Sequence, residues 1–104
     1  MDEVVLLSKA MADKNRLNIV ALIQREEKLC VCELSDTLHL SQPLVSRHLK
    51  QLKAADVLES KKEGKWIIYS ICERPSRLLE AYLETLKPLA DTLDDVITCQ
   101  TRQS

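Results

Sequence analysis

The chain contains a single glycine, Gly64, and this residue lies between two short segments that are rich in strand-forming residues. Residues 57–62 and 65–71 predict two strands joined through Glu63 and Gly64, because glycine adopts the positive φ that a tight hairpin turn needs. Elsewhere Gly and Pro are scarce, and Leu, Ala, Glu and Lys are abundant. We therefore expect a mainly α fold with one small β-hairpin.

The composition predicts one small domain spanning residues 1–104, with 45% apolar residues, 30% charged residues and no Phe. The core must then be built from Leu, Ile and Val. The N-terminal residues lack the pattern of a signal peptide, and no apolar run approaches the ~20 residues that span a bilayer. We expect a cytoplasmic protein without membrane contact, whose four cysteines are metal-binding, redox-active or inert.

Apolar spacing predicts a first helix over residues 2–12, a second capped by Asp13, and a third over about 31–38. A fourth helix has a strong start signal, since Ser41 is a good N-cap and Pro43 lies in the first turn. Residues 31–55 thus predict a helix-turn-helix. The hairpin over residues 57–71 follows it directly, as the wing of a winged helix-turn-helix.

The fourth helix combines an apolar face with a face suited to a major groove. From Ser41 to Ala55 the chain has three cations and no acid, and three more lysines crowd the hairpin tip. Phosphate binding needs such a local patch of positive charge and does not require a positive net charge of the whole chain. The predicted DNA-binding residues are Ser41, Gln42, Ser46, Arg47, Lys50 and Lys53 on the helix, and Lys61, Lys62 and Lys65 on the wing.

A last helix is predicted over residues 76–97, with Pro88 expected to kink or split it near Lys87. Its apolar residues are spaced by alternating steps of three and four: Leu79, Tyr82, Leu86, Leu89, Leu93 and Val96. Such an a/d seam is more apolar than a small monomer needs, which favours a homodimer. Two recognition helices related by a two-fold axis would then meet successive major grooves of double-stranded DNA.

Cys30 and Cys32 form a C-x-C pair at the predicted start of the third helix. Thiolates bind soft metals and react with oxidants, so the pair is a candidate metal or redox site. Residues two apart on a helix point about 200° away from each other, so ligand binding is expected to distort the first turn. Cys99 and Cys72 are the candidates for a third thiolate, and His39 could add to an incomplete zinc set.

Several strings resemble the ArsR/SmtB family of bacterial metal-responsive repressors. They are residues 10–17 (AMADKNRL), 29–34 (LCVCEL), 40–43 (LSQP), 46–49 (SRHL) and 63–66 (EGKW). The resemblance covers residues 6 to 72 and implies a dimeric winged helix whose first and last helices form the interface. The implied interface residues are Val4, Leu7, Met11, Leu79, Tyr82, Leu86, Leu89 and Leu93. The family motif also allows His48 a DNA contact.

The resemblance implies a repressor that releases its operator on binding arsenite, antimonite or a methylated trivalent arsenical, with no cofactor permanently bound. In arsenic repressors of this type a third cysteine commonly follows the second by three residues, but here that position is Ser35. The zinc-sensing branch places an Asp/His set on the last helix, which this chain lacks. The third ligand therefore stays open.

Three alternatives remain. The inducer could be cadmium or lead bound through Cys30, Cys32 and Cys99, or the cysteines could form a thiol redox sensor. The chain could also be a dimeric interaction module that never touches DNA. An enzyme is not expected, because the sequence has no G-x-S-x-G motif, no P-loop and only one glycine.

Overall fold

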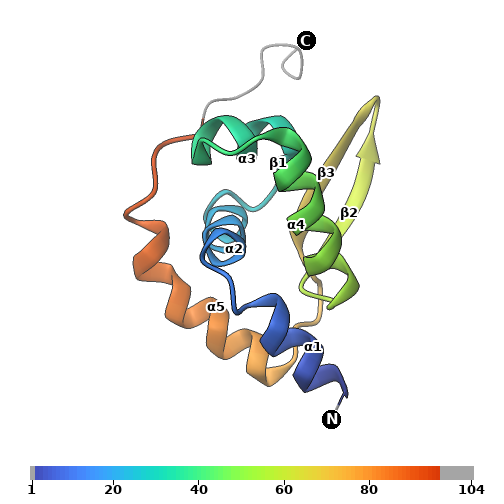
Figure 1. Cartoon of the computed structure of the whole chain (residues 1–104), viewed down its shortest axis with the longest axis vertical. Coiled ribbons are helices and arrows are strands. Elements are labelled where there is room, and N and C mark those ends of the chain that lie inside the picture. The colour runs from blue at the N-terminus through green and yellow to red at the C-terminus, as the bar shows by residue number, and fades with distance from the viewer. Residues whose placement is uncertain (1, 97–104) are drawn as a thin grey trace.

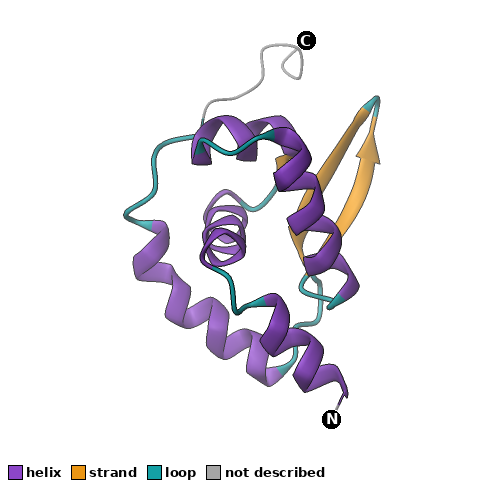
Figure 2. Cartoon of the chain, viewed as in Figure 1, coloured by secondary structure: helices purple, strands orange, loops and turns teal. Residues whose placement is uncertain are grey.

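The computed structural model describes residues 2–96, which form helices and one small sheet (Figures 1 and 2). In chain order the elements are α1 (Asp2–Ala10), α2 (Lys14–Glu26), β1 (Leu29–Cys30), α3 (Val31–Leu38), α4 (Gln42–Ala54), β2 (Leu58–Glu63), β3 (Trp66–Ile71) and α5 (Arg77–Ala90). The mainly helical fold with a hairpin after α4 is confirmed. None of the helices in this range is long and apolar enough to cross a membrane.

Helix α2 forms the centre of the molecule, and the other helices surround it (Figure 1). Five consecutive residues, Ile19 to Ile23, are fully buried, so this helix is covered on all sides rather than along one stripe. It begins as predicted, because the Asp13 side chain accepts a hydrogen bond of 3.0 Å from the Arg16 backbone N–H. Helix α5 packs along α2, and α3, α4 and β3 also contact it.

The turn between α3 and α4 is held by hydrogen bonds around Ser35. Its carbonyl accepts the N–H groups of His39 and Leu40, and its hydroxyl donates to the Leu40 carbonyl over 2.5 Å. His39 adopts the left-handed conformation (φ 59°) that ends α3. Helix α4 then begins with the predicted Ser41 cap, whose hydroxyl accepts the Leu44 N–H.

The sheet has the strand order β1-β3-β2 and is antiparallel throughout. In the β2–β3 hairpin Glu63 pairs with Trp66, and Gly64 takes a φ of 64° in the turn, as expected. Strand β1 was not predicted, since two residues are too short to show a periodic pattern. It adds Leu29 and Cys30 to the far edge of β3, opposite Tyr69 and Ile68.

Two predictions about the last helix are wrong. Helix α5 ends at Ala90 rather than near residue 97, and of the predicted kink or split near Lys87 the split is excluded, because the helix continues past Pro88. Pro88 lies in the final turn, so its missing N–H affects only the helix end. There the Arg25 guanidinium donates to the carbonyls of Ala90, Leu93 and Asp94 over 2.7 to 3.0 Å and caps the helix.

The predicted dimer seam also needs correction. Leu79, Leu83, Leu86 and Ala90 form the buried face of α5, and they pack in the core of their own chain. Leu7 and Met11 are likewise buried, while Tyr82, Leu89 and Leu93 are half-buried against the same core. A helix with apolar residues every three or four positions buries one apolar face, and the central helix α2 already covers that face of α5. Of the predicted interface residues, Val4 is the one that is largely exposed.

Candidate functional site

The Sγ atoms of Cys30 and Cys32 lie 3.5 Å apart. Cys30 precedes α3 with an extended backbone (φ −98°, ψ 170°), and Cys32 lies in the first helical turn. The premise that both residues lie inside the helix is therefore wrong, because Cys30 precedes it. Pairing of Cys30 with Ile68 in the sheet keeps it extended and brings the sulfur atoms together.

Cys30 is the more protected of the two cysteines, with 1% of its surface exposed. Burial raises the pKa of the Cys30 thiol, the Glu33 backbone N–H opposes this rise, and the charge of the Glu33 carboxylate adds to it. Glu33 is itself buried and accepts the Cys30 backbone N–H over 3.0 Å, as in a capping box. A ligand that binds this sulfur must displace its proton.

The spacing of the sulfur atoms suits chelation of one soft ion. Metal–thiolate bonds of about 2.3 Å would span a 3.5 Å separation with an angle of about 100° at the ion. The pair can therefore supply two adjacent ligands, and the remaining coordination positions of the ion need other donors.

Cys72 is not placed to provide a third ligand within the chain. Cys30 pairs with Ile68, and Cys72 lies four residues further along the same strand direction, about 13 Å away. His39 lies at the opposite end of α3, where its Nε2 is 3.3 Å from Asp94 Oδ2. Within residues 2–96 no three His, Cys, Asp or Glu side chains form a metal-binding group. Cys99 lies outside the described residues.

The second candidate surface is formed by α4 and the β2–β3 hairpin, which lie side by side (Figure 1). The predicted DNA-binding residues other than His48 are exposed: Ser41, Gln42, Ser46, Arg47, Lys50, Lys53, Lys61, Lys62 and Lys65, with Ser60 half-buried beside Lys53. Lys53 Nζ donates to Ser60 Oγ over 2.6 Å and thereby joins α4 to β2. The helix and the hairpin thus form one basic surface.

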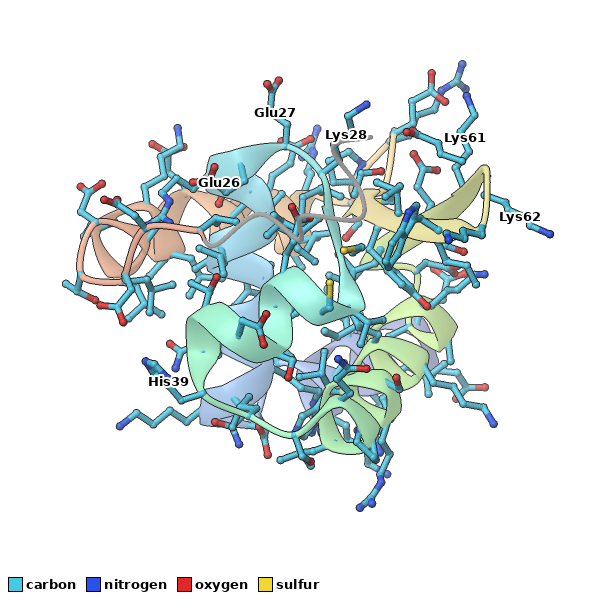
Figure 3. The ribbon with its side chains drawn as sticks, turned by 90° about the horizontal axis from the view of Figure 1, so that it is seen from above. Glu26, Glu27, Lys28, His39, Lys61 and Lys62 are labelled. Carbon is cyan, nitrogen blue, oxygen red and sulfur yellow. The ribbon has the colours of Figure 1, made fainter. Side chains whose placement is uncertain are left out.

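Figure 3 shows Lys61 and Lys62 on the hairpin and His39 on the opposite side of the molecule. Lys28 extends toward the hairpin in the same view, and its Nζ lies 3.6 Å from Glu63 Oε2. This ion pair links the segment before β1 to the end of β2. The segment that carries Cys30 is thus joined to the wing by an ion pair as well as by the β1–β3 pairing.

The prediction of a DNA contact for His48 is wrong. Only 7% of this side chain is exposed, and its Nδ1 lies 3.3 Å from Arg16 Nη1. Burial lowers the pKa of His48, the nearby Arg16 and Arg47 lower it further, and the Asp13 carboxylate opposes them. The role of Arg16 was not evident from the sequence, because a lone arginine on a helix usually marks a solvated face.

Comparisons with known proteins agree with this arrangement. The profile of a family described as "Bacterial regulatory protein, arsR family" matches residues 13–60. The arsenic resistance transcriptional regulator ArsR1 of Pseudomonas putida is 40% identical over 79 residues, which cover 76% of this chain and 62% of the relative. The regulator ArsR2 of the same strain is 38% identical over 88 residues, covering 84% of this chain and 76% of the relative.

The fold also matches solved structures. Reduced HlyU from Vibrio cholerae N16961 superposes with a TM-score of 0.72 at 34% sequence identity, over 85% of this chain and 88% of that chain. The matched region of this chain thus spans most of HlyU but less than two thirds of ArsR1.

Proposed function

The chain belongs to the arsR family of bacterial regulatory proteins, and on that premise we propose that it is a repressor whose operator affinity is controlled by the Cys30–Cys32 pair. Helix α4 and the wing bind operator DNA, and a trivalent arsenic or antimony compound bound by the two thiolates releases it. The observation that carries this proposal is the 3.5 Å separation of two sulfur atoms at the start of the helix-turn-helix. The family is one of regulators, not enzymes.

The ligand class follows from the donors. Two adjacent thiolates favour soft ions over hard cations, which prefer oxygen ligands. A methylated trivalent arsenical has two open positions, which Cys30 and Cys32 satisfy. Arsenite and antimonite have three, so they need one more donor or a retained hydroxide.

Cys99 of the same chain is the third donor that we propose for the inorganic ions. Asp94 is held beside the end of α3 by His39, and its carbonyl accepts a 2.7 Å hydrogen bond from Arg25. Cys99 is the fifth residue after Asp94, a reach of up to about 17 Å. His39 and Cys32 are seven residues apart along α3, about 10 Å. The length of chain is therefore sufficient for Cys99 to reach the thiol pair.

Release of DNA requires that the ligand bind better to a conformation that fits DNA poorly. The ligand would act at the junction of β1 and α3, and α3 packs directly on α4. Ser35 connects the end of α3 to the segment leading into α4. A shift or tilt of α3 would thus be transmitted to α4, the helix proposed to read DNA and called the recognition helix below.

We also propose a homodimer, formed through α1 and the start of α5. Three neighbouring apolar residues of α1 are largely exposed: Val4 (48%), Val5 (46%) and Leu6 (52%). Leu78 at the start of α5 is also exposed, and α1 and this end of α5 lie side by side (Figure 1). A two-fold axis through this patch would present two α4 helices to half-sites about 34–36 Å apart.

The proposal is tested by titrating the protein–operator complex with arsenite, antimonite, phenylarsine oxide, cadmium and the thiol oxidant diamide. Fluorescence anisotropy of labelled operator, obtained by selection from random DNA, reports release. We expect release by the trivalent arsenic and antimony compounds at concentrations near that of the protein. Release by cadmium alone would identify the cadmium-responsive alternative, and release by diamide alone would identify the redox sensor. Failure to bind any DNA in a salt-dependent manner would favour the interaction module.

A further inference from the structure

Arg16 connects the C-terminus of α1 to the recognition helix. On one side, its Nε donates to the Ala10 carbonyl over 2.6 Å, and its Nη2 donates to the Lys9 carbonyl over 3.1 Å. These are carbonyls of the last turn of α1, which have no partner within the helix. Arg16 therefore acts as a C-terminal cap, although it belongs to α2.

The other side of the guanidinium contacts α4. Its Nη1 donates to Gln51 Oε1 over 2.5 Å and lies 3.3 Å from His48 Nδ1. Because arginine has no acceptor, His48 Nδ1 must accept this hydrogen bond, and a neutral His48 then carries its proton on Nε2. The Asp13 carboxylate lies 4.0 Å from the same Nη1 and partly balances the charge.

Apolar packing between α1 and α4 is incomplete at this place. A groove of about 360 Å³ separates them, with Leu6, Lys9 and Ala10 on one wall and Gln51, Ala54 and Ala55 on the other. Arg16 lies in the groove and bridges both walls. The relative position of the two helices here therefore depends on directed hydrogen bonds more than on close-packed side chains.

We propose that Arg16 is a positioning residue for DNA binding, which fixes α4 relative to α1 without touching DNA. This inference rests on the proposed function, in which α4 reads DNA and α1 carries the dimer contact. His48 and Gln51 flank Lys50 on α4, so the guanidinium holds the side of the helix next to the residues proposed to contact DNA. In a dimer, this junction would set the spacing and orientation of the two recognition helices.

The test compares Arg16→Lys and Gln51→Ala with wild type on three DNA duplexes: the operator, the operator with one base pair inserted between half-sites, and a single half-site. Lysine keeps the charge but loses the planar fork. Gln51→Ala removes one of the two contacts to α4, keeps the one to His48, and leaves both α1 carbonyls capped. Arg25→Lys is the matched control, since Arg25 caps α5 in the same way and has no bond to α4.

We expect Arg16→Lys and Gln51→Ala to bind the operator roughly tenfold more weakly, with an unchanged salt slope and unchanged affinity for the half-site. Their preference for the operator over the inserted sequence should shrink, while Arg25→Lys keeps the wild-type preference. Equal losses on operator and half-site, a reduced salt slope, or a wild-type spacing preference in both variants would overturn the inference. Wild-type protein that binds no DNA specifically would instead overturn the proposed function, and the inference with it.

Discussion

At the scale of single residues, Ser35 occupies the place of a third thiol and has a structural role instead. Its buried hydroxyl donates to the Leu40 carbonyl in the turn before α4. The C-x-C pair and the missing cysteine were both evident from the sequence. The 3.5 Å separation of the sulfur atoms was not, because it depends on the pairing of Cys30 with Ile68, a residue 38 positions later in the chain.

Ser35→Cys should make the operator complex more sensitive to arsenite than to phenylarsine oxide. Ser35 lies three residues after Cys32 on the same side of α3, so a cysteine there can offer a third thiolate to an ion with three open positions. Operator release measured by anisotropy checks this. Ser8→Cys is the control, because Ser8 is exposed on α1, which lies at the other end of the molecule from α3 (Figure 1). Equal sensitisation by both substitutions would contradict the argument.

His48 should make folding stability depend on pH. Burial lowers its pKa from 6.5 in the folded protein, and Arg16 and Arg47 add to this effect, while Asp13 opposes it. The unfolded chain therefore binds a proton that the folded chain excludes, and the free energy of unfolding should fall as pH drops below about 6.5. Urea denaturation between pH 8 and 5 measures this. His48→Gln should flatten the profile, and an equally steep profile in His48→Gln would contradict this account.

At the scale of elements, α4 and the hairpin were predictable because their signals are local: a serine cap, a proline in the first turn and one glycine. The end of α5 was not, because its cap comes from Arg25, which is distant in sequence. The buried face of α5 was also misassigned. Apolar residues spaced by three and four positions occur both as Leu79-Tyr82-Leu86 and as Leu79-Leu83-Leu86. Only the position of α2 decides which of these two sets forms the buried face of α5.

The recognition helix and the wing should contribute differently to DNA binding. Lys62→Ala should weaken binding to all sequences and reduce the salt slope by about one, since this exposed wing lysine is proposed to contact phosphate. Gln42→Ala should instead relax specificity by about 1–3 kcal/mol at one base pair. Binding to operator and random DNA over a range of salt concentrations measures both effects. Equal losses on the two DNAs for Gln42→Ala would show that Gln42 does not read a base.

At the scale of the whole molecule, the proposed dimer places two recognition helices on one DNA duplex. Leu6→Glu should give a folded monomer, because Leu6 is 52% exposed on the apolar patch and a charge there opposes burial. Leu86→Glu should instead unfold the chain, since only 6% of Leu86 is exposed. Sedimentation and circular dichroism separate the two results. Ser8→Glu, a change at an exposed polar position of α1, controls for added charge. Wild-type protein that sediments as a monomer at micromolar concentration would contradict the proposed dimer.

The central claim is that the thiol pair at the start of α3 controls the DNA surface of the whole molecule. The most direct test is operator release by arsenite from Cys30→Ser, followed by fluorescence anisotropy, with Cys72→Ser as the matched control. We predict that both variants bind operator like wild type, that Cys72→Ser releases it at the wild-type arsenite concentration, and that Cys30→Ser does not release it. Release of Cys30→Ser at the wild-type arsenite concentration would contradict the claim, because DNA binding would then respond to arsenic without the pair.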